Sequence, residues 1–204
     1  MIDPAILRFI AITDNVRDGQ AGLIERASAA ARGGATCIQL RLKDVTARDL
    51  AALAEELIRS IGVPLIINDR ADVALAVGAA GVHLGADDIP VRAVRSFAPP
   101  GFMIGASVGS NDEVENAEGA DYVGIGPVYA SGSKKDAGKA IGLVEFSRLA
   151  AATGLPAVAI GGITQANARA AIEAGAAGIA AIASVFGATD PLAAAREMAS
   201  AIGT

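Results

Sequence analysis

The amino-acid sequence predicts one α/β domain over residues 1–204, a single (β/α)8 barrel of the TIM-barrel class. The first observation is a repeated Gly-Ala turn, which follows an Ala-rich amphipathic run and precedes a short apolar run, at Gly34, Gly78, Gly119 and Gly175. A helix stopped by glycine and followed by a β-branched run is typical of a helix-to-strand junction. The second observation is that further apolar runs, before and between these turns, raise the number of expected strands to eight. Strands that alternate with helices form a parallel sheet, and 204 residues lie at the compact end of the barrel range.

The expected strands are short apolar runs bounded by glycine or polar residues. In chain order they are 7–13, the run from Cys37, 63–69, the run from Gly81, 102–107, the run from Asp121, 155–162 and 178–185. Segments with helical periodicity separate them, for example 21–34, 46–62, 164–176 and 190–203. The competing architecture is an open doubly wound sheet, which more often has five to seven strands and a single Gly-rich first turn.

Composition excludes several classes of function. Hydrophobic residues make up 52% of the chain and charged residues 19%, which is not the composition of a disordered protein. Aromatic residues are only 3%, Trp is absent and the net charge is −5, so we expect no nucleic-acid or membrane partner. The lone Cys37 cannot form an intramolecular disulfide, and the first residues lack the basic segment of a signal peptide. We therefore expect a cytoplasmic protein.

Two cations lie at the end of the second expected strand. In a barrel the carboxyl ends of the strands carry the chemistry, and side chains alternate along each strand. Gln39, Arg41 and Lys43 are therefore expected to face the barrel axis. A buried charge without a partner costs several kcal/mol, so the two cations indicate an anion. The anion is a ligand phosphate, or alternatively a protein carboxylate such as Asp69 or Asp88.

Acidic and amide side chains follow the third and fourth strands. Asn68 and Asp69 end the third, and Asp87 and Asp88 come shortly after the fourth. Oxygen ligands close to cations suit a Mg²⁺ ion that keeps several waters and bridges phosphate oxygens. The alternative is that the Asp pair caps the next helix. His83 is the only histidine, so it cannot build a zinc site, and we expect it to be a packed supporting residue.

Two further segments indicate phosphate binding. The long stretch 126–142 follows the sixth strand and offers hydroxyls and ammonium groups at Ser131, Ser133 and Lys134, although it could also be a solvated surface loop. The segments 160–164 and 182–184 follow the seventh and eighth strands, where many barrels bind phosphate through backbone amides. Ser107, among small residues at the end of the fifth strand, lies where backbone can approach a ligand closely. The cations on one side of the barrel opening and the backbone amides on the other side form two expected anion-binding regions. Together they fit two phosphorylated ligands or one bisphosphate.

These segments, in this order, resemble the thiamine phosphate synthase (thiamine-phosphate pyrophosphorylase) family over nearly the whole chain. The matching stretches are 12–14, 39–44, 65–70, 81–85, 121–129, 133–136 and 159–164. The resemblance implies a transferase that joins hydroxymethylpyrimidine diphosphate to thiazole phosphate and releases thiamine phosphate and diphosphate. It implies a dissociative reaction, in which diphosphate leaves and the thiazole nitrogen captures a pyrimidine-methyl cation. Preorganised cations and a metal would stabilise the charge that develops.

The resemblance also assigns roles to individual positions. It implies that Gln39 and Asn68 contact the pyrimidine substrate and that Ser107 lies near the reacting groups. The residues implied to hold the diphosphate are Arg41, Lys43 and Lys134, and those implied to hold Mg²⁺ are Asp69 and Asp88. The residues implied to line the thiazole phosphate site are Ser131, Ser133, Gly162, Ile182 and Ala183. Family precedent further implies a homodimer.

The chain departs from the family pattern at several positions. Members commonly carry Gln at Ala86, Ala-His at Val108-Gly109, Thr at Ser131 and Ser133, and Ser at Ala183. A sister family, the thiazole tautomerases, shares Ser107-Val108, but its proton-transferring His would fall at Gly109. The set Arg41, Lys43, Asn68 and Lys134 favours the synthase, because a tautomerase has no diphosphate to hold. The remaining alternative is a non-catalytic barrel that binds a thiazole or thiamine phosphate.

Overall fold

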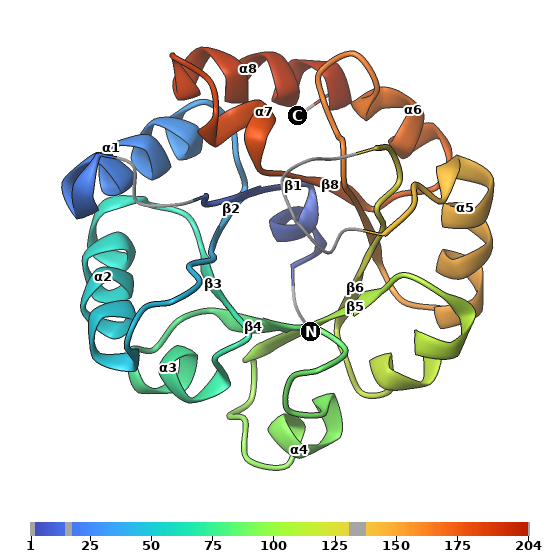
Figure 1. Ribbon diagram of the computed structural model, residues 1–204, viewed down its shortest axis with the longest axis horizontal. Coiled ribbons are helices and arrows are strands. Elements are labelled where there is room, and N and C mark those ends of the chain that lie inside the picture. The colour runs from blue at the N-terminus through green and yellow to red at the C-terminus, as the bar shows by residue number, and fades with distance from the viewer. Residues whose placement is uncertain (1–2, 15–17, 131–137, 204) are drawn as a thin grey trace.

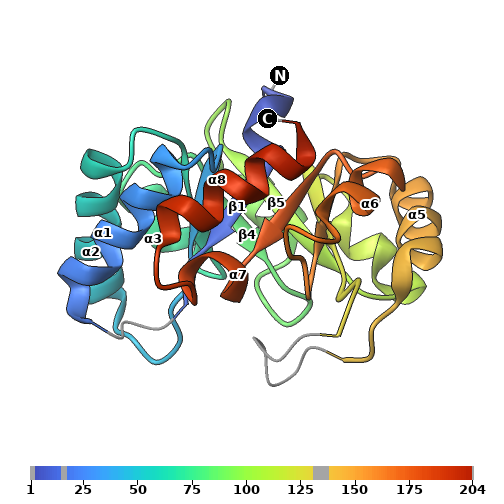
Figure 2. The same cartoon turned by 90° about the horizontal axis from the view of Figure 1, so that it is seen from above.

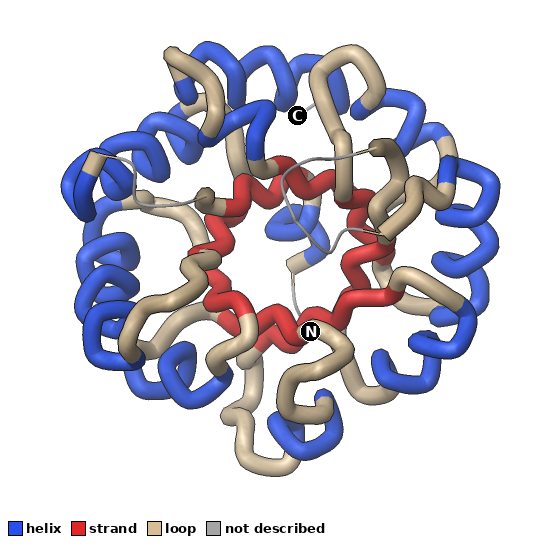
Figure 3. Tube along the Cα trace, viewed as in Figure 1, coloured by secondary structure: helices blue, strands red, loops and turns tan. Residues whose placement is uncertain are grey.

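The computed structural model describes residues 3–14, 18–130 and 138–203 and shows a closed barrel of eight parallel strands inside a ring of helices (Figures 1 and 3). Each strand pairs with the next along the chain, and β8 pairs with β1, so the open-sheet alternative is wrong. The strands are β1 (Phe9–Ile12), β2 (Cys37–Leu40), β3 (Leu65–Asn68), β4 (Gly81–Leu84), β5 (Met103–Val108), β6 (Tyr122–Ile125), β7 (Ala157–Ile160) and β8 (Gly178–Ala181).

Helices cover the outside of the barrel and one of its two ends. They are η1 (Pro4–Leu7), α1 (Gly19–Arg32), α2 (Ala47–Ser60), α3 (Ala71–Ala76), α4 (Val91–Arg95), η2 (Asn111–Ala117), α5 (Gly142–Thr153), α6 (Ala168–Glu173), α7 (Ala183–Phe186) and α8 (Pro191–Ile202), where η marks a 3-10 helix. Within the described residues, no helix has both the length and the apolar character needed to cross a membrane.

Local sequence explains the longer helices. In α2 the Thr46 hydroxyl accepts the Asp49 N–H at 3.1 Å, and the buried residues repeat at helical spacing, as at Leu50, Leu53 and Leu57. Helix α8 begins at Pro191, and the Asp190 carboxylate caps the helix by accepting the N–H groups of Leu192 and Ala193. Such caps and apolar stripes hold the outer helices against the barrel.

The last expected strand is shorter than predicted. The run 178–185 forms a strand only to Ala181, and residues 183–186 form helix α7 instead. The backbone of Ile182 (φ −111°, ψ −84°) is neither helical nor extended and turns the chain away from the barrel. The Ser184 hydroxyl then donates to the Ile163 carbonyl at 2.8 Å, which attaches α7 to the loop after β7.

The inside of the barrel is packed with side chains. The buried interior cluster comprises Leu7, Ile10, Ile12, Cys37, Ile66, Met103, Tyr122, Val158 and Ala180. Leu7 comes from η1, which lies at the face of the barrel where both termini emerge; α7 lies at the opposite face (Figure 2). The barrel is therefore filled at the amino ends of its strands, and a ligand has access only at their carboxyl ends.

Candidate active site

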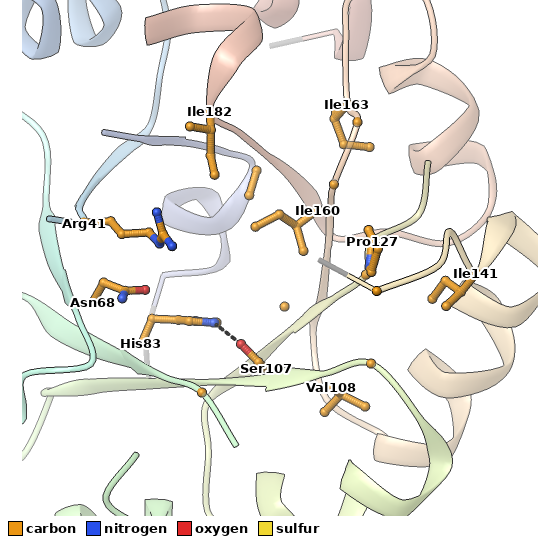
Figure 4. Close-up of a pocket in the computed structure, with 18 of the residues that line it drawn as sticks. Arg41, Asn68, His83, Ser107, Val108, Pro127, Ile141, Ile160, Ile163 and Ile182 are labelled. Atoms are coloured by element: carbon orange, nitrogen blue, oxygen red, sulfur yellow. Dashed lines mark hydrogen bonds between the residues drawn. The ribbon is translucent and has the colours of Figure 1, made fainter. Parts of the chain in front are cut away.

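A cavity of about 970 Å³ opens at the carboxyl ends of the strands (Figure 4). Cavities that bind small molecules have volumes of roughly 300–1,000 Å³. Most of the expected site residues line it, namely Arg41, Lys43, Asn68, Asp69, Asp88, Ser107, Gly162, Ile182 and Ala183. Ser131, Ser133 and Lys134 lie outside the described residues. The barrel thus brings together side chains that are more than 140 positions apart in the sequence.

Arg41 extends into the cavity from the end of β2 (Figure 4). The buried Thr13 side chain holds its backbone, because the Thr13 hydroxyl accepts the Arg41 N–H at 2.9 Å and donates to the Arg41 carbonyl at 3.0 Å. Among the described residues, no carboxylate lies within 4.0 Å of the Arg41 guanidinium, so the alternative of an internal ion pair is not realised for Arg41. Its charge faces the space that a ligand would occupy.

The carboxylates of Asp69 and Asp88 line the same cavity. Asp69 has a left-handed backbone, with φ of 65°, and its N–H donates to the His83 carbonyl at 2.8 Å. One Asp88 carboxylate oxygen accepts the Gly85 N–H at 2.6 Å. In the described chain α4 starts after Pro90 without a side-chain cap, so Asp88 closes its own loop and does not cap that helix.

The donor set can be tested against a magnesium ion. Among the residues that the structure describes, no three His, Cys, Asp or Glu side chains are close enough together to hold a metal ion. Two carboxylates beside cations nevertheless fit Mg²⁺, because this ion is usually held by one or two carboxylates, several waters and the phosphate oxygens of a substrate. The magnesium site at Asp69 and Asp88 stays a prediction.

A row of buried polar side chains lies beneath the cavity. His83 is 9% exposed, and its ring nitrogens contact the Tyr122 hydroxyl and the Ser107 hydroxyl, each at 3.0 Å. Gln39 hydrogen-bonds to Tyr122 from the other side. His83 is thus a packed supporting residue, as expected, whereas the sequence analysis overlooked Tyr122. Tyr122 pairs with Gly105 on β5, a relationship that depends on strand register and that the sequence alone does not reveal.

Gln39 lies deeper than expected. It is 3% exposed, and the described residues that line the cavity do not include it. Strand alternation points Gln39 and Arg41 to the same side of β2, but Gln39 is two residues closer to the centre of the barrel. Its side chain reaches Tyr122, and its contact with the pyrimidine substrate stays a prediction.

The opposite wall of the cavity follows β7. Gly161 and Gly162 have φ values of 92° and 65°, and a Cβ on Gly162 would lie 2.6 Å from the Ala130 carbonyl oxygen. Asn167, which the sequence analysis did not single out, accepts the Thr164 N–H at 2.8 Å and donates to the Gly162 carbonyl at 2.9 Å. Only glycine fits here without strain, so this loop presents its backbone to the cavity.

The family can be identified by comparison with known sequences. The sequence model described as "Thiamine monophosphate synthase" matches residues 9–185. The chain belongs to this family. Thiamine monophosphate synthases are transferases, and the expected (β/α)8 barrel and family resemblance are both confirmed.

Named relatives of the thiamine monophosphate synthase family agree with this assignment. The thiamine-phosphate synthase of Roseiflexus castenholzii is 49% identical over 192 residues, which cover 92% of this chain and 84% of that protein. The thiamine-phosphate synthase of Methanoculleus marisnigri is 52% identical over 174 residues, with coverage of 83% and 82%. The solved thiamine phosphate pyrophosphorylase from Pyrococcus furiosus superimposes with a TM-score of 0.84 at 36% identity, covering 98% of this chain and 97% of that one.

Proposed function

We propose that this family member transfers the hydroxymethylpyrimidine group from its diphosphate to thiazole phosphate by a dissociative, Mg²⁺-assisted substitution. The bond between the pyrimidine methylene carbon and the bridging diphosphate oxygen breaks, and diphosphate leaves with the electron pair. The thiazole nitrogen then donates its lone pair to the resulting pyrimidine-methyl cation. The products are thiamine phosphate and diphosphate, so atoms and charge balance without any further reactant.

The observation that carries the proposal is the layout of the cavity. Arg41 and Lys43 enter from the β2 wall, whereas Gly162 lies on the β7 wall. One wall therefore has cations for a diphosphate, and the other has glycine backbone for a second phosphate. A volume of about 970 Å³ accommodates two small phosphorylated molecules together. A tautomerase or a single-ligand binding barrel requires only one of these walls.

Each side chain has a task in this reaction. Arg41, Lys43 and Lys134 would bind the diphosphate and stabilise its growing negative charge as the bond breaks. Asn68 would hold the pyrimidine, and Ser107 would donate to the substrate near the reacting carbon. The thiazole phosphate would bind beside Ser131, Ser133, Gly162, Ile182 and Ala183. Asp69 and Asp88 would hold Mg²⁺, which supplies further positive charge to the diphosphate.

The decisive experiment mixes the purified protein with both substrates and Mg²⁺ and measures both products. We expect thiamine phosphate and diphosphate in equal amounts. Diphosphate release without thiamine phosphate, or isomerisation of the thiazole alone, would reject the transfer reaction. Tight binding of thiazole phosphate without any turnover would identify the non-catalytic barrel.

The dissociative order of events has its own test. Hydroxymethylpyrimidine diphosphate labelled with ¹⁸O at the bridging position is incubated with enzyme and Mg²⁺ without thiazole phosphate. If the C–O bond breaks reversibly before capture, the label spreads to non-bridging oxygens of the recovered substrate. A label that stays at the bridging position, in an enzyme that makes product when thiazole phosphate is added, would contradict the dissociative mechanism.

A further inference from the structure

A continuous series of hydrogen bonds connects the centre of the barrel to the cavity. Gln39 bonds Tyr122, the Tyr122 hydroxyl lies 3.0 Å from His83 Nδ1, and His83 Nε2 lies 3.0 Å from the Ser107 hydroxyl. The last of these contacts is drawn in Figure 4, with Ser107 at the edge of the cavity. We call these four residues the polar relay. Three of its members are at least 91% buried, and of the four, His83 and Ser107 line the cavity.

The surrounding residues are shaped to hold the relay. A Cβ on Gly105 would lie 2.5 Å from the Tyr122 hydroxyl oxygen, and one on Gly124 would lie 3.0 Å from the His83 ring. Two neighbouring strands therefore lack side chains where the aromatic ring and the imidazole lie. A buried polar group without a hydrogen bond is costly, so donors and acceptors along the relay must alternate.

Two directions satisfy this alternation. In the first, Gln39 donates to Tyr122, Tyr122 donates to Nδ1 of His83, and Nε2–H donates to Ser107. The Ser107 hydroxyl proton is then left to point into the cavity. In the second direction every bond is reversed, Ser107 donates to His83, and only its oxygen lone pairs face the cavity.

The surroundings favour the first direction. Burial raises the pKa of the Tyr122 hydroxyl, which keeps it protonated and able to donate to His83 Nδ1 at 3.0 Å. The cavity also contains Arg41 and Lys43, and a site that attracts an anion gains from one more donor and loses from an acceptor.

We propose that Tyr122 and His83 are positioning residues. Tyr122 holds His83 as the Nε2–H tautomer, and His83 then donates to the Ser107 oxygen, so that the Ser107 hydroxyl proton is directed to the bound diphosphate substrate. The substrate's identity rests on the function proposed above. The direction of the relay is a property of the free protein and can be measured without any turnover.

The first test is NMR of the imidazole. His83 is the only histidine in the chain, so the two ¹⁵N signals of uniformly labelled protein need no assignment. At pH 8 we expect the shifts and couplings of a neutral ring protonated at Nε2. Tyr122→Phe should abolish this preference, whereas Tyr129→Phe, which alters the other tyrosine, should preserve it. A ring protonated at Nδ1, or a tautomer mixture in the wild-type protein, would overturn the proposal.

The second test compares two replacements of His83. The amide of Gln reaches the position of Nε2 and can still donate to Ser107, whereas the shorter Asn reaches only the position of Nδ1. We expect His83→Gln to keep kcat within about tenfold and His83→Asn to lower it by at least about a hundredfold, with KM for thiazole phosphate unchanged in both. Equal loss in the two variants would count against the relay.

A double-mutant cycle separates positioning from packing. If His83 acts through Ser107, the variant His83→Asn/Ser107→Ala should be no slower than Ser107→Ala. Losses that multiply would overturn the proposal. Should His83→Asn fail to fold, Tyr122→Phe replaces it in the cycle, and the NMR result on the wild-type protein stands by itself. A wild-type protein without synthase activity would reject the proposed function, while the NMR measurement would still decide the direction of the relay.

Discussion

The hydroxyl of Thr13, at the end of β1, bonds both backbone polar groups of Arg41, at the end of β2. It accepts the Arg41 N–H at 2.9 Å and donates to the Arg41 carbonyl at 3.0 Å. Thr13 is completely buried, and its own N–H donates to the Gln39 carbonyl at 2.9 Å. One small side chain therefore continues the pairing of two strands beyond the barrel sheet. It also sets the direction in which the Arg41 side chain leaves the backbone.

Thr13→Val keeps the shape of the side chain but removes the hydroxyl. It leaves two partly buried backbone groups of Arg41 without this partner, so we expect kcat/KM to fall by at least about tenfold. Thr13→Ser retains the hydroxyl and should stay within about threefold of wild type. Steady-state kinetics of both variants tests this. Equal activity of the Val and Ser variants would show that the Thr13 contact does not position Arg41.

Arg41→Ala removes a cation that faces the cavity without a carboxylate partner among the described residues. We expect turnover to fall by at least about a hundredfold, the effect of losing a transition-state contact of roughly 3 kcal/mol. Lys134→Ala should cause a loss of the same size. The control is Arg48→Ala on the exposed side of α2, which should leave kcat unchanged. An unchanged rate in either of the first two variants would reject that residue's role.

Asp69→Asn neutralises one carboxylate of the expected magnesium site. Asn tolerates a left-handed backbone, so the φ of 65° can be kept while the charge is lost. The Mg²⁺ concentration for half-maximal activity should rise by at least about tenfold, as expected when a hard cation loses a charged ligand. Asp44→Asn is the matched control, because Asp44 has a φ of 62° and is exposed. Identical magnesium curves for the two variants would remove Asp69 from the site.

Gly162→Ala tests the wall that follows β7. Gly154 has the same φ of 65°, but a Cβ there would meet nothing within 4 Å, whereas one on Gly162 would lie 2.6 Å from the Ala130 oxygen. Gly154→Ala should lose about 1–2 kcal/mol of unfolding free energy from the left-handed backbone, and Gly162→Ala should lose more because its Cβ also meets the Ala130 oxygen. Only Gly162→Ala should raise KM for thiazole phosphate, by at least about tenfold. Denaturant titrations and kinetics on the same samples measure both quantities.

Cys37 should be chemically inert in the native protein. It lies in the barrel interior with no exposed surface, and burial raises the pKa of its thiol, which keeps it protonated. Since the thiolate is the reactive form, we expect a thiol reagent at pH 8 to react at least about a hundredfold more slowly with native than with unfolded protein. Similar rates in the two states would contradict this packing of β2.

Much of the architecture follows from local patterns. Each Gly-Ala turn ends a helix and starts a strand because glycine adopts the left-handed backbone that other residues avoid, as at Gly78 and Gly175. Alternation along β2 was enough to predict that Arg41 turns inward, since side-chain direction on a strand depends on the backbone alone. Local pattern was a poor guide at 178–185, where a uniformly apolar run contains both β8 and α7.

The sequence by itself determined the barrel, the family and a group of the residues at the cavity, because periodicity and short motifs depend on neighbours along the chain. Only the tertiary structure decided how deep each inward residue lies and what it touches. Gln39, which is expected to contact the substrate, also bonds Tyr122, and His83 joins Tyr122 to Ser107 across three strands. Such contacts depend on strand register and on the space left by Gly105 and Gly124, which are set only when all eight strands close around one interior.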